Sequence, residues 1–290
     1  MSTTPLVSIG LPVKNGFGNH SKNEINISNS LKALINQSYK NIEIIVSNDC
    51  SVDNTKQFLN KMSKIDSRIK VFHQKKEISW AKNFRFVLNK SKGKYFKWNA
   101  ADDMISKDYI INNVKFLENN LDFISSSSKF LYENDPNKFY SFDLVGSLYS
   151  RIKGFFKVRH ISHNILFSLV RRKNMMKTID ISKDYWAVDW MFDLDLLFQG
   201  NFKTIDEGYA KFGMKGMSRQ SNFINREIYL KKKIYYIFPF YELMKRVFLK
   251  TILNNKINIF QKISIYFSLI NINIYFIKLH RLKKLKIFSN

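Results

Sequence analysis

The sequence predicts an α/β fold built on a doubly wound, mostly parallel sheet, because short apolar runs alternate with helical patterns along its first half. The runs with the composition of buried strands are residues 6–12, 42–47, 69–72 and 95–98. Apolar residues recur at helical spacing in the intervals, at 28–38, 55–62 and 81–90. A chain of 290 residues with 45% hydrophobic residues can also bury a large core, which excludes global disorder.

Each of the first three predicted strands is followed by its own helix, as in parallel βαβ units. Pro12 is expected to stop the first strand, and Ser28 is the expected N-cap of the helix after it. In such sheets ligands bind beyond the carboxyl ends of the strands. The polar clusters of this chain fall at those ends, so we expect its binding site there.

The chain becomes less regular after about residue 120. Strands are expected near residues 122–132 and 164–170, and a helix is expected from Asp189 to Gln199, where Gly200 ends it. A final region is basic, aromatic and helical. We therefore predict an α/β domain over residues 1–225, with halves of about 1–120 and 121–225, and a basic amphipathic helical extension over residues 226–290.

The formal net charge of +25 favours a polyanionic partner, which is nucleic acid, anionic lipid or a phosphate-bearing substrate. The extension is rich in Lys and Arg, with only Glu227 and Glu242 opposing them. Its longest apolar stretch, Ile263–Ile277, contains Asn271 and Asn273 and is too short and polar for a transmembrane helix. Helices lying on an anionic membrane surface fit this pattern better. The alternative is helices packed on the first domain with a solvated basic face.

The cysteine content, the N-terminal sequence and the absence of nucleic-acid-binding motifs limit the expected compartment and partners of the protein. The single Cys50 excludes an intrachain disulfide and fits a reducing compartment. We see no secretory signal at the N-terminus, so we expect a cytoplasmic protein at the inner face of the membrane. Zinc-ligand spacing and RNA-binding motifs are absent, so no nucleic-acid partner is expected, although a basic nucleic-acid-binding protein stays the alternative from another class.

Three acidic clusters carry the candidate chemistry. Asp49 follows the second strand, where its carboxylate could accept hydrogen bonds from a base or sugar; the alternative is a turn in which Ser51 or Asp53 caps the next helix. Asp102 and Asp103 follow the fourth strand. Two adjacent carboxylates repel each other, and a hard divalent cation with a diphosphate would relieve this repulsion; the alternative is a solvated turn.

The third cluster lies at the start of the predicted helix. Asp189 stands between Trp186 and Trp190, an apolar setting that would raise the pKa of its carboxyl toward use as a base. The alternative is a carboxylate that stabilises the helix N-terminus through the macrodipole. Asp193, one turn further on, is the rival candidate for the base.

These clusters, in this order, resemble family 2 of the inverting glycosyltransferases, which have the GT-A fold and include many bacterial surface-polysaccharide enzymes. The resemblance spans roughly residues 5–215. Leu6–Asn15 resembles the opening strand, whose Pro-x-x-Asn end binds the nucleotide base, and Asp49-Cys50-Ser51-Val52-Asp53 resembles the Asp-Gly-Ser-x-Asp motif. Lys82-Asn83 resembles an Arg-Asn step, and Gly93–Asp103 resembles the segment that leads into the Asp-x-Asp metal motif. Val188-Asp189 resembles the acidic pair that supplies the base.

The resemblance implies a transfer reaction and assigns its residues. The donor is a nucleotide-sugar, with a UDP-sugar expected, and the acceptor is a glycan or a lipid-linked hydroxyl in capsule or O-antigen assembly. Asp189 would be the base, and Asp103 with Asp102 would bind Mn²⁺ or Mg²⁺. The donor-binding residues would be Pro12, Val13, Asn15, Asp49, Ser51, Asn83 and Asp102. The basic residues that could assist the diphosphate are Lys14, Lys82 and Arg171.

The sequence departs from the family pattern at two important positions. Ala100 replaces the first Asp of the metal motif, and Val188 replaces the Glu before the base. A catalytically inactive relative therefore remains an alternative. A nucleotidyltransferase on the same fold is a further alternative, but Pro12–Gly16 does not reproduce the Gly-rich basic signature that such enzymes carry after the first strand.

Overall fold

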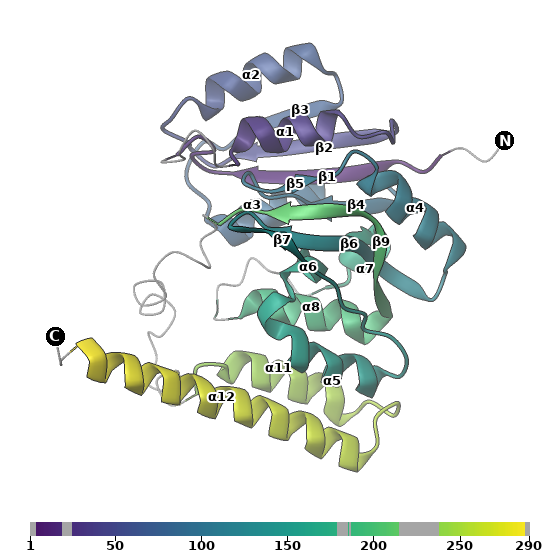
Figure 1. Cartoon of the computed structure of the whole chain (residues 1–290), viewed down its shortest axis with the longest axis vertical. Helices are drawn as coiled ribbons and strands as arrows, with labels where there is room; N and C mark the ends of the chain where they lie inside the picture. Colours follow the sequence, from purple (N-terminus) through teal and green to yellow (C-terminus); the bar gives the residue numbers. More distant parts are fainter. Residues whose placement is uncertain (1–3, 19–24, 179–184, 186, 215–237, 288–290) are drawn as a thin grey trace.

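A computed structural model describes residues 4–18, 25–178, 185, 187–214 and 238–287. These residues form a nine-stranded sheet with helices on both faces (Figure 1), which confirms the expected α/β fold. The strands are β1 (Val7–Val13), β2 (Ile42–Asn48), β3 (Ile69–His73), β4 (Tyr95–Trp98), β5 (Met104–Ile105), β6 (Phe123–Tyr132), β7 (Asp135–Tyr140), β8 (Leu169–Arg171) and β9 (Asn201–Phe212). Their spatial order is β3-β2-β1-β4-β8-β6-β9-β5, with β7 paired to β6.

The helices divide between the two faces of the sheet. They are α1 (Ile27–Ile35), α2 (Thr55–Ile65), α3 (Trp80–Lys90), α4 (Tyr109–Asn119), α5 (Leu148–Val158), α6 (His163–Leu166), α7 (Arg172–Met175), α8 (Val188–Gln199), α11 (Tyr241–Ile252) and α12 (Ile259–Ile287), with a 3₁₀ turn at Arg159–Ile161. One hydrophobic core joins α1, α2 and α4 to the sheet, and a second joins α3, α5 and α8 to it. Each face of the sheet is therefore buried, as parallel strands require.

The first half of the sheet is parallel, as expected. β1 pairs with β2 and β4, and β2 pairs with β3, all in parallel. Pro12 lies inside β1 opposite Ser47 and does not end the strand, contrary to our expectation. The reason is that β4 ends opposite Gly10, so β1 has an open edge at Pro12, where a missing N–H is tolerated. Asn26, and not Ser28, caps α1 by accepting the Ser28 N–H at 2.9 Å.

The second half of the sheet mixes directions. β6 pairs with β9 in parallel and with β8 in antiparallel, and β8 joins this half to β4. The strand expected at 164–170 is wrong for its first part, because residues 163–166 form the short helix α6. Its Asn164 is buried and accepts a hydrogen bond from Ser127 Oγ at 2.7 Å, which holds this turn against β6. The expected helix from Asp189 to Gln199 is confirmed as α8.

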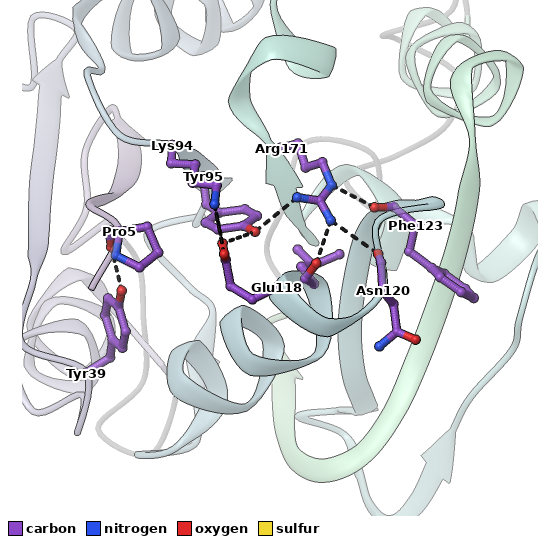
Figure 2. A network of polar contacts seen from close by, with 9 residues as sticks. Pro5, Tyr39, Lys94, Tyr95, Glu118, Asn120, Phe123 and Arg171 are labelled. Carbon is purple, nitrogen blue, oxygen red and sulfur yellow. Dashed lines mark hydrogen bonds and ion pairs between the residues drawn. The ribbon is translucent and has the colours of Figure 1, made fainter. Parts of the chain in front are cut away.

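Arg171 at the end of β8 forms a buried polar network that ties the two halves together (Figure 2). Its Nε donates to the Phe123 carbonyl at 2.8 Å, its Nη1 to the Tyr95 hydroxyl at 3.1 Å and its Nη2 to the Asn120 carbonyl at 3.2 Å. The guanidinium thus holds the carbonyls at the end of α4. Because these donors are committed inside the protein, the expected role of Arg171 near a diphosphate is wrong.

The C-terminal helices pack on the α/β domain. α11 contacts α8, and α12 contacts both α11 and α5 (Figure 1). Asn273, which interrupts the apolar stretch of the sequence, points inward: it is buried and accepts the Phe240 N–H at 3.1 Å. None of the helices in the described part of the chain combines the length and the apolar character needed to cross a bilayer. Residues 226–237 of the predicted extension lie outside the described residues.

Candidate functional site

The loops that follow β1 and β2 are bound to each other through two of the expected donor-binding residues. The Asn15 N–H donates to Ser51 Oγ at 2.8 Å, and Asn15 Oδ1 accepts the Val52 N–H at 2.9 Å. Asn15 has a positive φ of 51°, which Asn tolerates better than most residues. The structure therefore brings Asn15 and Ser51 together, and both help to shape the end of the sheet.

Asp49 lies beside this pair of loops. Its N–H donates to the Val13 carbonyl at 2.8 Å, and its Oδ1 accepts the Ile78 N–H at 2.9 Å. The next residue, Cys50, has a φ of 51°, in the left-handed region that favours glycine. This explains why the motif that resembles this segment has glycine there, and it shows that the turn forms without glycine.

Asp53 has a structural role at the start of α2, which was the alternative that the sequence analysis left open. Its Oδ2 accepts the N–H groups of Phe17 and Gly18 at 2.9 and 3.1 Å, and its Oδ1 accepts the Thr55 N–H at 3.0 Å. Burial disfavours the charged carboxylate, but the hydrogen bonds outweigh it and lower the pKa of Asp53. Asp53 therefore fastens the loop after β1 to the start of α2.

Asn83 is buried on α3 behind the loops. Its Nδ2 donates to the Ser47 carbonyl at 3.1 Å, and its Oδ1 has no hydrogen-bond partner among the residues described. The basic residues suggested beside it differ in setting: Lys14 forms an exposed ion pair with Glu77 at 2.6 Å, and Lys82 is exposed.

The acidic pair follows β4 at the carboxyl edge of the sheet, where β1 also ends. Asp103 is buried, with its Oδ1 accepting the Gly213 N–H at 3.0 Å, whereas Asp102 is partly exposed. Buried Asn99 supports the turn by donating from Nδ2 to the Asp103 carbonyl at 3.1 Å. Burial, and next the Asp102 carboxylate, raise the pKa of Asp103 well above its usual range.

Gly213, just after β9, backs this pair, and the sequence analysis missed it. A Cβ at this position would lie 2.3 Å from the Asp102 carbonyl oxygen and 2.7 Å from its Oδ2. Only glycine lets the backbone approach the carboxylates so closely. The available signal was the glycine that directly follows a long strand, but the sequence does not show what that glycine approaches.

The residues of the acidic pair fit a divalent cation. Burial and the neighbouring Asp102 carboxylate favour the protonated form of Asp103 unless a positive charge compensates them. Buried Asn99 Oδ1 has no hydrogen-bond partner in the part of the chain that the structure describes, so a further hard oxygen is present in the same turn. The described residues contain no cluster of three or more His, Cys, Asp or Glu that would hold a metal by themselves. Mn²⁺ or Mg²⁺ would therefore need phosphate oxygens as further ligands, which is common for these ions.

Lys97 on β4 is a second residue that the sequence analysis missed. It is buried, and its Nζ donates to the carbonyls of Trp98 and Phe167 at 3.0 and 2.6 Å. Burial lowers the pKa of Lys97, and the negative charge of Asp103 opposes this decrease. A lysine inside an apolar strand was the available signal. Its positive charge lies within electrostatic range of the acidic pair.

Asp189 lies in the first turn of α8, partly buried. Burial raises the pKa of its carboxyl, and hydrogen bonds from the Trp190 N–H and its own N–H oppose the rise. Ala187, the N-cap residue of α8, has a positive φ of 62°, a strained conformation for alanine. The chain therefore turns sharply two residues before Asp189. Trp186, expected to flank Asp189, lies outside the described residues.

Asp193, the rival candidate, is buried deeper in the same helix. Burial, and next the Asp189 charge, raise its pKa well above the usual range, while a hydrogen bond with the Ser162 side chain opposes the rise. Asp193 therefore faces the protein interior beside Ser162. Between the two carboxylates, Asp189 is the more accessible to a substrate.

The C-terminal helices hold α8 in place. Trp190 stacks on Phe240 with ring centroids 5.3 Å apart and an interplanar angle of 6°. On the opposite side of α8, Phe192 contacts Trp98 of β4 at 5.0 Å between centroids. Asp189 is thus carried by a helix fixed between the sheet and the C-terminal region.

This sheet, with its acidic turn after the central strand, defines a GT-A glycosyltransferase fold, and solved structures match it. The S. aureus TarS fragment 1–349 in complex with UDP-GlcNAc aligns with a TM-score of 0.65 and 18% identity, over 91% of this chain and 71% of that one. A mannosyltransferase from Pyrobaculum calidifontis, in complex with GDP-Man and Mn²⁺, aligns with a TM-score of 0.55 and 14% identity, over 92% of this chain and 69% of that one.

Sequence comparison supplies the family. The profile of Glycosyl transferase family 2 matches residues 8–180, which is more than half of the chain, and the protein belongs to this family. An uncharacterised glycosyltransferase of Haemophilus influenzae is 29% identical over 249 residues, covering 81% of this chain and 73% of that protein. Bacillus subtilis TuaG, whose name ascribes it to teichuronic acid biosynthesis, is 28% identical over 113 residues, covering 39% of this chain and 42% of that protein. The protein is therefore a glycosyltransferase.

Proposed function

We propose that this enzyme transfers a sugar, with inversion, from a UDP-sugar to a hydroxyl of a glycan or lipid-linked acceptor in cell-surface polysaccharide assembly, such as capsule or O-antigen. The observation that carries the proposal is the acidic pair Asp102–Asp103 at the carboxyl edge of the sheet, backed by the Gly213 N–H. The TarS complex with UDP-GlcNAc and the TuaG likeness support the donor class and the process.

The donor would lie across the ends of β1, β2 and β4. Asp49 accepts a hydrogen bond from the base, and the linked loops of Asn15 and Ser51 shape the pocket floor next to Pro12 and Val13. Asp102 and Asp103 would hold Mn²⁺ or Mg²⁺, and Asp102 would also contact the ribose. When bound, the cation neutralises the charge that develops on the leaving diphosphate. Asn83 supports this arrangement from behind β2.

Asp189 is the general base of the proposed reaction. Its carboxylate takes the proton of the acceptor hydroxyl while that oxygen forms a bond to the anomeric carbon and the bond to the diphosphate breaks. One displacement inverts the anomeric configuration. Its raised pKa suits the role, because a base is most effective when its pKa approaches the working pH.

The test compares two isosteric variants of α8. Asp189→Asn keeps the volume of the side chain but cannot accept the proton, so we expect transfer to fall by about 10²–10⁴-fold while UDP-sugar binding is unchanged. Asp193→Asn, one turn away and buried, is the matched control and should stay within about threefold of wild type. Transfer is measured with a panel of nucleotide-sugars and Mn²⁺, and NMR of the product identifies the anomer.

Contrary outcomes distinguish the rival functions. Loss of transfer in Asp193→Asn but not in Asp189→Asn would make Asp193 the base, and a retained anomer would exclude the single displacement. Donor binding without turnover in wild type would indicate an inactive relative, in keeping with Ala100 and Val188. Salt-sensitive RNA binding without donor hydrolysis would favour a nucleic-acid-binding protein.

We further propose that α12 places the enzyme on an anionic membrane surface at the inner face of the membrane. One stripe of this helix is buried, through Ile265, Leu269 and Ile272. A second apolar stripe recurs three or four residues apart and is exposed. Its members are Phe260, Ile263, Phe267, Ile270 and Ile274. Phe260 is 79% exposed and Phe267 is 61% exposed, so this face of α12 has no partner among the described residues.

Charge selects the occupant of this exposed stripe. Residues 243–290 contain no Asp or Glu, whereas Lys256, Lys262 and Lys278 accompany the stripe. A second copy of the chain would oppose one basic face to another, which is unfavourable. A bilayer with anionic headgroups satisfies both the apolar side chains and the lysines. Such a surface also presents lipid-linked acceptors.

A vesicle assay tests the membrane proposal. Phe260→Ser with Phe267→Ser should abolish sedimentation with phosphatidylglycerol vesicles, and Phe139→Ser on β7 is the matched control, because Phe139 is 48% exposed away from α12. Wild type should not sediment with phosphatidylcholine vesicles. If the wild-type protein sediments with neither kind of vesicle and is dimeric by light scattering, the exposed stripe binds a second copy of the chain and the membrane proposal is wrong.

A further inference from the structure

A hollow lies between the end of α7, α8 and α11, and neither Asp102 nor Asp103 lines it. Its volume is about 260 Å³. The residues that line it include Lys177, Thr178, Met191, Asp195, Arg246 and Lys250. α11 comes from the C-terminal region and α8 carries Asp189, so the hollow lies where these two parts meet. We refer to it as the α8–α11 pocket.

The α8–α11 pocket is positively charged. It brings three cations together with one carboxylate, Asp195, which is buried and paired with Lys250 at 2.7 Å between Oδ1 and Nζ. Within the described part of the chain neither Lys177 nor Arg246 has a carboxylate partner. Two positive charges therefore remain for a ligand, and a small anion is the class that they attract.

Arg246 is held in a fixed orientation. Its guanidinium lies over the ring of buried Tyr185, 4.9 Å from the centroid. Among the described residues its buried Nε has no hydrogen-bond acceptor, which is unusual for an arginine donor. A stacked planar guanidinium with unused donors is the arrangement that recognises phosphate through paired hydrogen bonds.

The position of the pocket indicates which substrate carries the anion. Met191 and Asp195 line it from α8, and Asp195 lies about 9 Å along the helix axis from Asp189, at 1.5 Å per residue. The charges of Arg246, Asp195, Glu242 and Asp189 all act on the Tyr185 phenol, so each of them lies within electrostatic range of that side chain. The donor diphosphate belongs at Asp102 and Asp103, which leaves the acceptor as the substrate near this pocket.

We propose that the α8–α11 pocket is a binding site for a phosphate group of the acceptor, held by Arg246 and Lys177. Assignment to the acceptor rests on the proposed function, whereas anion binding by the pocket does not. The acceptor class is therefore a phosphate-bearing glycan or a lipid-linked diphosphate whose hydroxyl reaches Asp189. In this arrangement the C-terminal region contributes to substrate choice through α11.

Binding of inorganic pyrophosphate to the full-length protein, in the presence of a chelator so that no divalent cation takes part, tests the pocket. We expect Lys177→Gln with Arg246→Gln to weaken binding by about 10- to 100-fold in calorimetry, as loss of charge-assisted hydrogen bonds predicts. The control, Lys173→Gln with Lys245→Gln, removes two exposed lysines on α7 and α11 outside the pocket and should bind like wild type. Equal affinities in all three proteins would overturn the proposal.

Two further measurements distinguish a loss of pocket binding from unfolding of the protein and from a loss of membrane binding. Lys177 is exposed, so Lys177→Gln alone cannot unfold the protein and should still weaken pyrophosphate binding several-fold. The double pocket variant should keep wild-type hydrolysis of the UDP-sugar and wild-type binding to phosphatidylglycerol vesicles. Lost vesicle binding would assign the phosphate to a lipid headgroup and overturn the acceptor assignment. Absent donor hydrolysis in wild type would refute the proposed function while the pyrophosphate result still stands.

Discussion

The two halves of the molecule position their candidate site carboxylates in different ways. Around β1, β2 and β4, side chains follow strand ends directly, and bonds between adjacent loops, such as Asn15 to Ser51, hold them. Asp189 instead lies on a helix fixed by Trp190 against Phe240, fifty residues later in the chain. The first arrangement depends on local turns. The second depends on packing by the C-terminal region, so the two should respond differently to mutation.

The largest expected effect is on the acidic pair. Asp102→Asn and Asp103→Asn should each lower Mn²⁺-dependent transfer by at least about 10²–10³-fold, because a cation supplies several kcal/mol of charge stabilisation. Both variants keep an oxygen acceptor, so their circular dichroism and melting temperature should match wild type. Near wild-type transfer that a chelator still inhibits would remove the substituted residue from the metal site.

The next effect tests the support of α8. Phe240→Ala should lower the free energy of unfolding by about 3 kcal/mol, because it leaves a cavity beneath the Trp190 ring. Phe238→Ala is the control: Phe238 is 40% exposed, and its loss should cost less than about 0.5 kcal/mol. Urea unfolding measures both. Equal stability of the two variants would mean that the C-terminal helices do not support α8.

Gly213→Ala sharpens the comparison at the other carboxylates. The new Cβ would displace the Asp102 backbone or its own, so we expect the Mn²⁺ concentration for half-maximal transfer to rise about tenfold. Melting temperature should change little, because the strain is confined to the site edge. A metal requirement identical to wild type would show that Gly213 does not position the acidic pair.

The smallest expected effect on transfer comes from Asp193→Asn, but its stability should depend on pH in a diagnostic way. Burial raises the folded-state pKa of Asp193 above its unfolded value of about 3.9. The carboxyl therefore contributes stability that is full below that value and is lost as pH rises through the folded-state pKa. Between pH 5 and 8 the unfolding free energy of wild type should fall more steeply than that of Asp193→Asn. Parallel pH profiles from urea unfolding would contradict a buried carboxyl at this position.

The sequence predicted those parts of the fold and site that depend on neighbours in the chain. The strands β1 to β4, helix α8 and the positions of Asp49, Asp102 and Asp103 at strand ends followed from periodicity and from the family resemblance. Gly213 and Lys97 were missed because their partners lie far away in sequence. The short helix α6 was read as strand, because a short apolar run has no decisive period.

The C-terminal region shows the same limit. Its composition indicated amphipathic helices but could not say that Asn273 faces Phe240 while Phe267 faces outward. The packed interpretation describes the buried stripe of α12, and the membrane-surface interpretation stays a proposal that depends on the exposed stripe. Only the structure separates the two apolar stripes.

The Arg171 contacts also set an order for folding while the chain is being synthesised. The carbonyls that Arg171 holds at Asn120 and Phe123 leave the ribosome 51 and 48 residues before the arginine does. Until then these two carbonyls lack the guanidinium, although β1 to β4 are already present. The nascent segment of residues 1–120 therefore gains this support for α4 only when β8 is made, and a ribosome stalled before β8 would leave the edge of β4 unpaired.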